Sequence, residues 1–127
     1  MINKIRRNEI YLANLGNTVG SEERGIRPVL IIQNDIGNKH SPTTIIIPIT
    51  SRLEKQNSIP THIKIKAFGK MRCKATIMAE QIKVIDKRRL IKRIDILPQK
   101  YINAVDRAIR IATNLQKINY KSNRACF

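Results

Sequence analysis

The stretch Gly25-Ile26-Arg27-Pro28-Val29-Leu30-Ile31-Ile32-Gln33-Asn34-Asp35 carries the most informative pattern in the chain. Pro28 to Gln33 reads as one apolar run, and turn-forming residues close it from Asn34 onward. A short apolar run that ends in turn residues predicts a strand buried on both faces. Arg27 stands at the start of this strand, directly after a polar loop bounded by Gly16 and Gly25.

Other strands are expected before and after this run. Residues 9–15 roughly alternate between apolar and polar, and residues 61–66 alternate isoleucines with basic or polar side chains. Residues 75–78 and 81–85 add two short strands. Residues 43–50 are strongly β-branched, but Pro48 lacks the N–H that a sheet ladder needs. We therefore expect that strand at an edge or bulged near its end, with Thr50 and Ser51 leaving the sheet.

The last third of the chain changes its period. After Pro98, which suits the first turn of a helix, apolar residues recur at steps of three and four to about Leu115. Residues 87–92 are expected to form a short helical turn before that helix. The fold class is therefore mainly β with a C-terminal helix, as a small, bent antiparallel sheet or partly open barrel. We expect a single domain over 1–115 and a basic, frayed tail over 116–127.

The chain has 127 residues, with 25 Lys and Arg against 9 Asp and Glu, for a net charge of +16. Residues 1–60 contribute +3 and residues 61–127 contribute +13, so the second half attracts polyanions, of which nucleic acid is the commonest in cytoplasm. With no Trp, 3 Tyr and 2 Phe, stacking on aromatic platforms is disfavoured. No export signal and no membrane span are read from the sequence, so a soluble, cytoplasmic protein is expected.

Metal and disulfide chemistry are disfavoured by the same composition. Cys73 and Cys126 lie far apart in sequence, without a further Cys or a nearby His at ligand spacing. Only 9 acidic residues are present and no carboxylate cluster has ligand spacing, which argues against a metal-dependent nuclease. We therefore expect no metal and no cofactor.

Four ordered segments carry a family resemblance. These are Thr18-Val19-Gly20-Ser21-Glu22, the Gly25 to Asp35 stretch, Ile49-Thr50-Ser51, and Glu80-Gln81-Ile82 with Ile85 to Leu90. Together they resemble the MazF/PemK toxin endoribonucleases from about Arg7 to Leu115. The resemblance implies a homodimer of SH3-like barrels similar to the CcdB/Kid fold, which cuts single-stranded RNA at a short sequence without a metal. It also implies a small acidic antitoxin of the MazE type as partner.

The resemblance also implies roles for individual residues. Arg27 of the Gly-x-Arg-Pro segment and Thr50 of the Ile-Thr-Ser segment correspond to the family's catalytic pair. The loop 21–26 resembles a flexible substrate gate, so its polar residues are RNA-binding candidates, together with Ser51 and Gln81 near the groove. The full set of RNA-binding candidates is Ser21, Glu22, Glu23, Ser51, Gln81 and Arg88. The chain departs from the family at Glu23-Arg24, where Gln-Gly is common, and at the unusually basic segment 72–74.

RNA cleavage without a metal uses the 2′-hydroxyl of the substrate as nucleophile. The protein must align that hydroxyl, stabilise the charged transition state and assist two proton transfers. The fork of Arg27 can bind two phosphate oxygens, and Thr50 can add a hydroxyl hydrogen bond. The general base stays open among four residues, Glu22, Glu23, His40 and His62.

Simpler interpretations accompany these assignments. Gln81 can instead satisfy a loop carbonyl, the two histidines can be solvated, and the run Lys87 to Arg89 can be an ordinary solvated face. A second function class is also open, namely a non-catalytic barrel that binds nucleic acid or poisons a protein target. The nuclease needs both Arg27 and Thr50 at one site, whereas a binder tolerates the loss of either.

Overall fold

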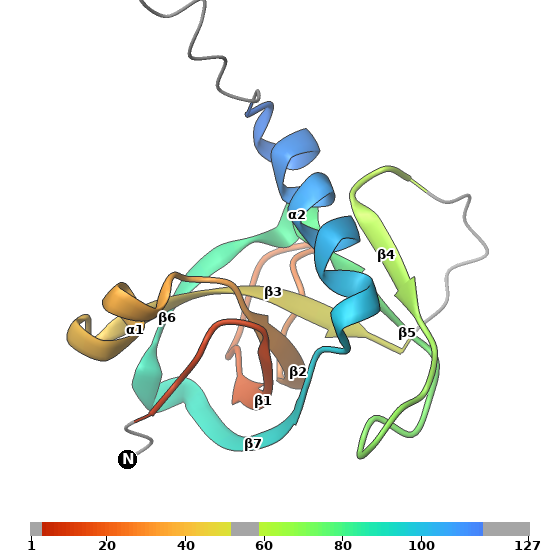
Figure 1. Cartoon of the computed structure of the whole chain (residues 1–127). Coiled ribbons are helices and arrows are strands. Elements are labelled where there is room, and N and C mark those ends of the chain that lie inside the picture. The colour runs from red at the N-terminus through yellow and green to blue at the C-terminus, as the bar shows by residue number, and fades with distance from the viewer. Residues whose placement is uncertain (1–3, 52–58, 116–127) are drawn as a thin grey trace, which may run out of the picture.

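The computed structural model describes residues 4–51 and 59–115, so the predicted basic tail over 116–127 lies outside the described residues. The described residues form a bent antiparallel sheet, two α-helices and two short 3-10 turns (Figure 1). The strands are β1 (Glu9–Asn14), β2 (Ile26–Ile31), β3 (Thr43–Thr50), β4 (His62–Ile65), β5 (Ala75–Met78), β6 (Lys83–Asp86) and β7 (Leu90–Ile96). The helices are α1 (Asp35–His40) and α2 (Gln99–Thr113), and the 3-10 turns are η1 (Ala79–Gln81) and η2 (Lys87–Arg89).

The strands follow the order β4-β5-β3-β2-β1-β7, and β6 also pairs with β3. All of the pairings are antiparallel. The path begins at β4 and ends at β7, which do not pair with each other within the described ranges, so the barrel is open. The mainly β class with a partly open antiparallel barrel and a C-terminal helix is therefore confirmed.

Strand β2 is buried on both faces, as its apolar run predicts. Leu30 and Ile32 belong to the apolar cluster that includes Val105 and Ala108 of α2, whereas Val29 and Ile31 belong to a second cluster. Val29, Leu30 and Ile31 are all completely buried. Each such side chain contributes about 1.5–3 kcal/mol relative to an exposed one. The strand is thus fixed from both sides at the centre of the molecule.

Helix α2 covers one face of the sheet (Figure 1). Its apolar residues recur on one side, where Val105 and Ala108 are buried in the first cluster. Pro98 stands at its N-cap, and Asn114 ends it in the left-handed conformation with φ of 54°. The helix predicted after Pro98 is therefore confirmed. In the described ranges, neither helix has the length and apolarity needed to cross a membrane.

Of the two expectations for the strand that contains Pro48, an edge position or a bulge near its end, the edge position is wrong. Strand β3 is central, with β2 along one side and β6 and β5 in succession along the other. Pairing with β6 ends at Ile46 and pairing with β5 begins at Ile49, so Pro48 lies at the gap where a missing N–H costs no ladder bond. Thr50 pairs with Thr76 and is the last residue of the strand, so only Ser51 leaves the sheet.

Two elements differ from the sequence expectation for local reasons. Residues 35–40 form α1 instead of a plain turn, because the Asn34 side chain accepts a hydrogen bond from the Gly37 N–H at 2.8 Å and caps the helix. The helical turn expected over 87–92 extends only over 87–89, and β7 follows. Three consecutive residues of β7 are exposed and its pairing with β1 shifts register, so no alternation marks it in the sequence.

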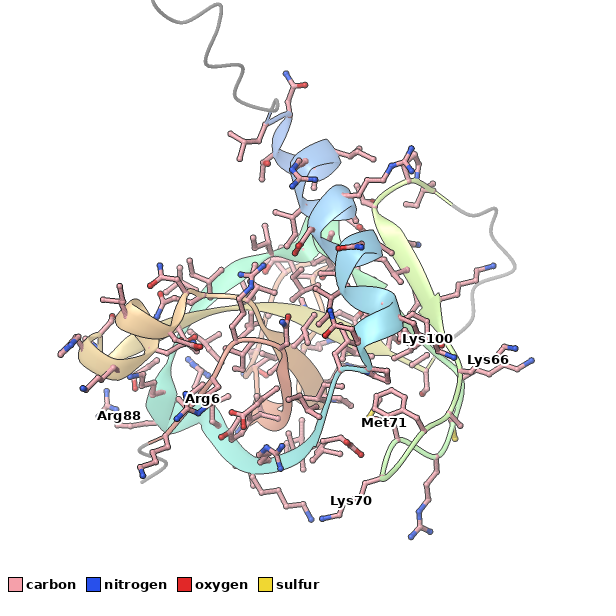
Figure 2. The ribbon with its side chains drawn as sticks, in the orientation of Figure 1. Arg6, Lys66, Lys70, Met71, Arg88 and Lys100 are labelled. Atoms are coloured by element: carbon pink, nitrogen blue, oxygen red, sulfur yellow. The ribbon has the colours of Figure 1, made fainter. Side chains whose placement is uncertain are left out.

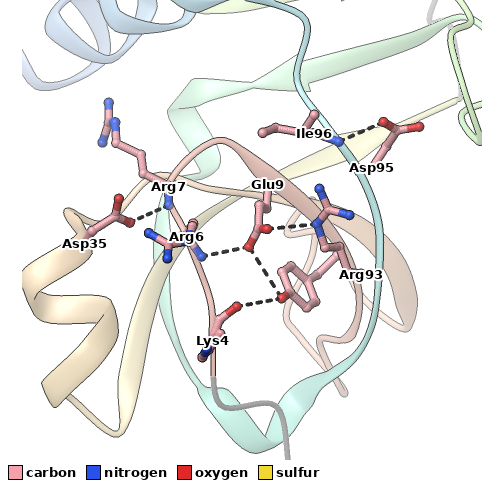
Figure 3. A network of polar contacts seen from close by, with 9 residues as sticks. Lys4, Arg6, Arg7, Glu9, Asp35, Arg93, Asp95 and Ile96 are labelled. Carbon is pink, nitrogen blue, oxygen red and sulfur yellow. Dashed lines mark hydrogen bonds and ion pairs between the residues drawn. The ribbon is translucent and has the colours of Figure 1, made fainter.

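A buried carboxylate ties β7 to β1 (Figure 3). Glu9 is 8% exposed and accepts hydrogen bonds from the Arg6 N–H at 2.7 Å and from Arg93 Nε at 2.8 Å. Burial, together with the charge of Glu9, raises the pKa of Tyr11 above its ordinary value. These contacts add a side-chain link between β1 and β7, the strand at the edge of the sheet.

Strand β7 in turn holds the connection between β4 and β5, which we call the basic hairpin (residues 66–74). Phe68 and Met71 pair across its tip with backbone hydrogen bonds of 2.8 and 2.7 Å. Asp95 of β7 accepts hydrogen bonds from the backbone N–H of Lys70 and of Ile96, both at 2.9 Å, which hold the pKa of Asp95 below its usual range. The hairpin tip is therefore anchored to the sheet.

Substitution of Gly69 by alanine is expected to weaken this anchor. Gly69 has φ of +48°, and a Cβ there would clash with Asp95 Oδ2. Gly20→Ala is the matched control, because Gly20 also has a positive φ of +59° but nothing within 4 Å of its Cβ position. Strain alone costs about 1–3 kcal/mol, and the clash at Gly69 adds to it. Urea unfolding should show a larger loss for Gly69→Ala, and equal losses would contradict the anchoring role of Asp95.

Candidate active site

Arg27 and Thr50 occupy neighbouring positions at one end of the two central strands. The pairing of β2 with β3 runs from Ile31 opposite Ile46 to Val29 opposite Pro48. Arg27 is the second residue of β2 and Thr50 is the last residue of β3, so both lie beyond the last of these pairs at the same end of the two antiparallel strands. The fold therefore leaves both residues at one end of the central strands, and their role as a catalytic pair stays a prediction.

A pocket of about 230 Å³, the cationic pocket, opens beside this pair. Its charged lining residues are Arg27, Lys70 and Arg72, and among the residues that the structure describes no carboxylate lines it. Ser51 also lines it, as its sequence motif suggests, although Thr50 itself is 7% exposed. The apolar part of the wall comes from the strands and the hairpin, through Pro28, Ile49, Met71, Ala75 and Ile94.

The guanidinium of Arg27 is held through its Nε atom. Nε donates a hydrogen bond to the Arg24 carbonyl at 2.9 Å, and it lies 3.1 Å from Glu23 Oε1 as an ion pair. Glu23 Oε1 is buried and accepts no hydrogen bond from the described residues, so its contact with Arg27 is electrostatic. Among those residues no hydrogen bond reaches the two terminal nitrogens of Arg27, which leaves that edge available for an anion.

Gln81 closes the predicted gate loop onto the sheet. Its Oε1 accepts a hydrogen bond from the Glu23 N–H at 2.9 Å, and its Nε2 donates to the Ser21 carbonyl at 3.3 Å. The simpler interpretation of Gln81, that it satisfies loop backbone groups, thus describes this structure. Its contact with an RNA base stays a prediction.

A second pocket of about 530 Å³, the acidic pocket, lies under the gate loop. It brings together the predicted candidates Ser21, Glu22, Glu23 and Gln81, and adds Glu80, Ile82 and Lys83. Three of its lining residues are acidic and one is basic. Its charge is therefore opposite to that of the cationic pocket, and Glu23 links the two through Arg27.

His62 is partly buried, with a side chain that is 22% exposed, and it is hydrogen-bonded where the simpler interpretation expects a solvated side chain. Its Nε2 lies 2.7 Å from Glu80 Oε2, and the Thr61 hydroxyl donates to Glu80 Oε1 at 2.8 Å. Burial alone raises the pKa of Glu80, but the hydrogen bonds from His62 and Thr61 outweigh it and lower the pKa overall. His40 is exposed at the end of α1, as expected. Neither histidine lines either pocket.

Arg88 lies apart from the two pockets. Its side chain is 78% exposed and its Nε lies 3.0 Å from Asp86 Oδ1, a hydrogen bond that lowers the pKa of Asp86. Figure 2 shows Arg88 and Lys70 on different sides of the view. An RNA contact of Arg88 stays a prediction, and the geometry resembles the solvated face described as its alternative.

The two hairpin cations of the cationic pocket, Lys70 and Arg72, were not among the candidates. The unusually basic segment was visible in the sequence, but only the fold shows that it meets the ends of β2 and β3. Within residues 4–51 and 59–115, no three His, Cys, Asp or Glu side chains gather in a way that could hold a metal ion.

Residues 6–113 match the family model described as the PemK-like, MazF-like toxin of type II toxin–antitoxin systems. The chain belongs to this family. It is 46% identical over 115 residues to the endoribonuclease MazF of Staphylococcus saprophyticus, which covers 90% of this chain and 95% of that protein.

Solved structures of MazF-like toxins share the fold at low sequence identity. MazF from Deinococcus radiodurans superposes with a TM-score of 0.76 at 18% identity, covering 87% of this chain and 97% of that chain. A mycobacterial endoribonuclease, solved in complex with its cognate antitoxin, gives 0.72 at 20% identity, over 90% of this chain and 99% of that chain. The open barrel with its C-terminal helix is therefore the architecture of MazF-like toxins.

The Glu80 site predicts a pH-dependent contribution to stability. Because folding lowers the pKa of Glu80, its contribution is fully present above the unfolded value of about 4.3 and is lost as the pH falls through the lowered value. Glu80→Gln should destabilise the protein at pH 7 by about 0.5–1.5 kcal/mol, at the low end because the side chain is partly exposed.

Thermal unfolding of both proteins at several pH values measures this difference. The difference should narrow below about pH 4. Glu22→Gln, which changes an exposed carboxylate of the gate loop, serves as the control and should leave stability unchanged. A difference for Glu80→Gln that stays constant over the whole pH range would contradict the ionic role of Glu80.

Proposed function

We propose that this chain is a metal-independent endoribonuclease toxin that cuts single-stranded messenger RNA, with Arg27 and Thr50 as its catalytic pair. Membership of the MazF-like toxin family and the 46% identity to an endoribonuclease support the activity. The observation that supports the residue assignment is the antiparallel pairing of β2 with β3, which leaves Arg27 and Thr50 at the same end of these strands, where Arg27 lines the cationic pocket. Cutting messenger RNA arrests translation, which accounts for the toxicity.

The chemistry uses a nucleophile from the substrate. The 2′-oxygen attacks the adjacent phosphorus, the bond from phosphorus to the 5′-oxygen breaks, and a 2′,3′-cyclic phosphate and a 5′-hydroxyl remain. A base takes the proton from the 2′-hydroxyl, and an acid gives one to the departing 5′-oxygen. DNA has no 2′-hydroxyl and is not a substrate for this reaction.

Arg27 stabilises the charge that develops on the phosphorane-like transition state. Its Nε atom is held by Arg24 and Glu23, which leaves its two terminal nitrogens to bind two oxygens of a phosphate. A guanidinium keeps its positive charge in proteins, which suits electrostatic stabilisation better than proton transfer. Thr50 ends β3 at the same end of the sheet, and its hydroxyl donates a hydrogen bond to an oxygen of the same phosphate.

Base recognition is assigned to the acidic pocket. Carboxylates accept hydrogen bonds from the exocyclic amino groups of bases, and they repel phosphates. Glu22 and Glu80 therefore face base edges, while the phosphate lies in the cationic pocket. Gln81 reads a base only after it releases the Glu23 N–H and the Ser21 carbonyl, so base reading and opening of the gate loop are one event.

The partners follow from charge. A net charge of +16 favours fast, salt-sensitive association with an acidic antitoxin of the MazE type, whose carboxylates compete with RNA for Arg27. We assign the protein to the cytoplasm, where its substrate is found, and expect it to act as a homodimer.

The deciding experiment incubates the purified protein with a long single-stranded RNA in excess EDTA and maps the cut ends. We expect discrete cuts with 5′-hydroxyl ends, and a loss of about 10²–10³ in rate for Arg27→Ala and a clear loss for Thr50→Ala. Arg107→Ala removes one charge from the exposed side of α2 and should cleave normally.

Other outcomes select other functions. Intact RNA that is only retarded on a gel would overturn the proposal in favour of a non-catalytic binder. Cleavage that appears only when metal is restored would overturn the metal-independent mechanism.

A further experiment tests the role of Glu23. Its carboxylate lies beside the fork of Arg27, so it repels an incoming phosphate. Glu23→Gln should lower KM by about five-fold at low salt, an effect that weakens as salt screens the charge, and should leave kcat nearly unchanged. Steady-state cleavage of a short RNA measures both constants. A collapse of kcat would contradict this expectation and would give Glu23 a part in the chemical step, either as the proton acceptor or by holding Arg27 in position.

A further inference from the structure

The basic hairpin places two cations on the rim of the cationic pocket. Lys70 and Arg72 line the same pocket as Arg27 and Ser51, although they are more than forty positions from Arg27 in sequence. Within the described residues, no carboxylate forms an ion pair with either side chain. Both charges are therefore available to an anion that enters the pocket.

The two cations stand on a fixed backbone. The bridge between Phe68 and Met71 closes the hairpin, and Asp95 holds the Lys70 N–H. Met71 is 8% exposed and packs in the apolar cluster that includes Val105 and Ala108, so its side chain holds the hairpin against the core. Figure 2 shows Met71 directed into the molecule and Lys70 at the hairpin tip. An ordered backbone reduces the entropy that these side chains lose on binding.

Apart from Ser51 and Cys73, the other described residues of the pocket wall are apolar. Pro28, Ile49 and Ile94 line it from three different strands, next to the cationic rim. A wall that is apolar on one side and positively charged on the other matches a nucleotide, whose base has a flat apolar face and whose phosphates are anionic. The acidic pocket, with three carboxylates, lacks this match for a phosphate.

We propose that the basic hairpin and the cationic pocket form a nucleotide subsite for single-stranded RNA next to the scissile phosphate. The base of that nucleotide packs against the apolar wall, and its flanking phosphate lies between Lys70 and Arg72. The subsite reads the RNA backbone and not its sequence, because both charged contacts go to phosphate. This inference rests on the proposed function, in that Arg27 marks the position of the scissile phosphate.

The test measures binding separately from cleavage. The probe is a fluorescent 2′-O-methyl RNA of mixed sequence, which has no free 2′-hydroxyl and cannot be cut wherever the cleavage site lies. Its affinity for the wild-type protein, Lys70→Ala, Arg72→Ala and the charge-matched control Arg107→Ala is measured by anisotropy over a range of salt. Arg72→Lys is included because it keeps the charge and changes only the shape.

We expect each hairpin variant to bind several-fold more weakly than Arg107→Ala. The slope of log affinity against log salt should fall by about 0.7 for each contact removed, and the loss should be the same for a second, unrelated sequence. Arg72→Lys should restore the slope. Thermal unfolding of each variant shows that the loss does not come from unfolding.

The outcomes separate this inference from the proposed function. Hairpin variants that bind like Arg107→Ala overturn the subsite, even if the wild-type protein cleaves RNA in EDTA. A loss that depends on the sequence of the probe also overturns it, because a phosphate contact has no sequence preference. A wild-type protein that never cleaves RNA overturns the proposed function, while weaker binding by the hairpin variants still supports the nucleotide subsite.

Discussion

The pairing of β3 along both of its edges is the constraint on which the rest of the structure depends. Strand β2 covers one side, and β6 and then β5 cover the other. Ile46, Ile47 and Ile49 are buried on alternate faces, so β3 contributes to both apolar clusters. Because neither β2 nor β3 can shift without breaking both clusters, the ends of these strands are fixed points. Arg27 and Thr50 stand at those ends, so the core sets their relative position.

Electrostatics divide the site into two regions with different tasks. The gate loop and η1 bring carboxylates together, while the basic hairpin brings cations, and Arg27 lies where they meet. RNA carries both amino groups that carboxylates bind and phosphates that cations bind. A site with one uniform charge would attract the backbone without holding a base in place. Under the proposed function, the two pockets together therefore favour one register of the RNA strand over others.

The sequence predicts the elements that have a regular hydrophobic pattern. It does not predict the elements whose formation depends on tertiary contacts. The apolar run of β2, the β-branched run of β3 and the periodic stripe of α2 were found because burial imposes those patterns. Strand β7 was missed because its exposed residues do not alternate and Glu9 holds it through Arg93.

The candidate site followed the same division. Arg27, Thr50 and Ser51 came from short motifs in the sequence, and the fold brings them to one end of the sheet. Lys70 and Arg72 belong to no such motif. Their position in the pocket depends on the hydrogen bond from the Lys70 N–H to Asp95, which holds the hairpin against β7. His62 was expected to be solvated because its partner, Glu80, is eighteen residues away in sequence.

Pro48 lies where the partner of β3 changes from β6 to β5, and this interruption of the sheet positions the residues that contact the gate loop. Pro48 has no N–H to donate, so the ladder along this side of β3 is interrupted at Pro48. The chain that continues from the end of β5 is therefore not paired with β3 at this position. The chain leaves the ladder there as η1 and returns to β3 as β6. Glu80 and Gln81 are residues of η1, so the interruption that Pro48 permits is what turns Gln81 toward the gate loop and Glu80 toward the acidic pocket. A regular strand in place of η1 would direct these two side chains to opposite faces of the sheet, and one of them would be lost from the site.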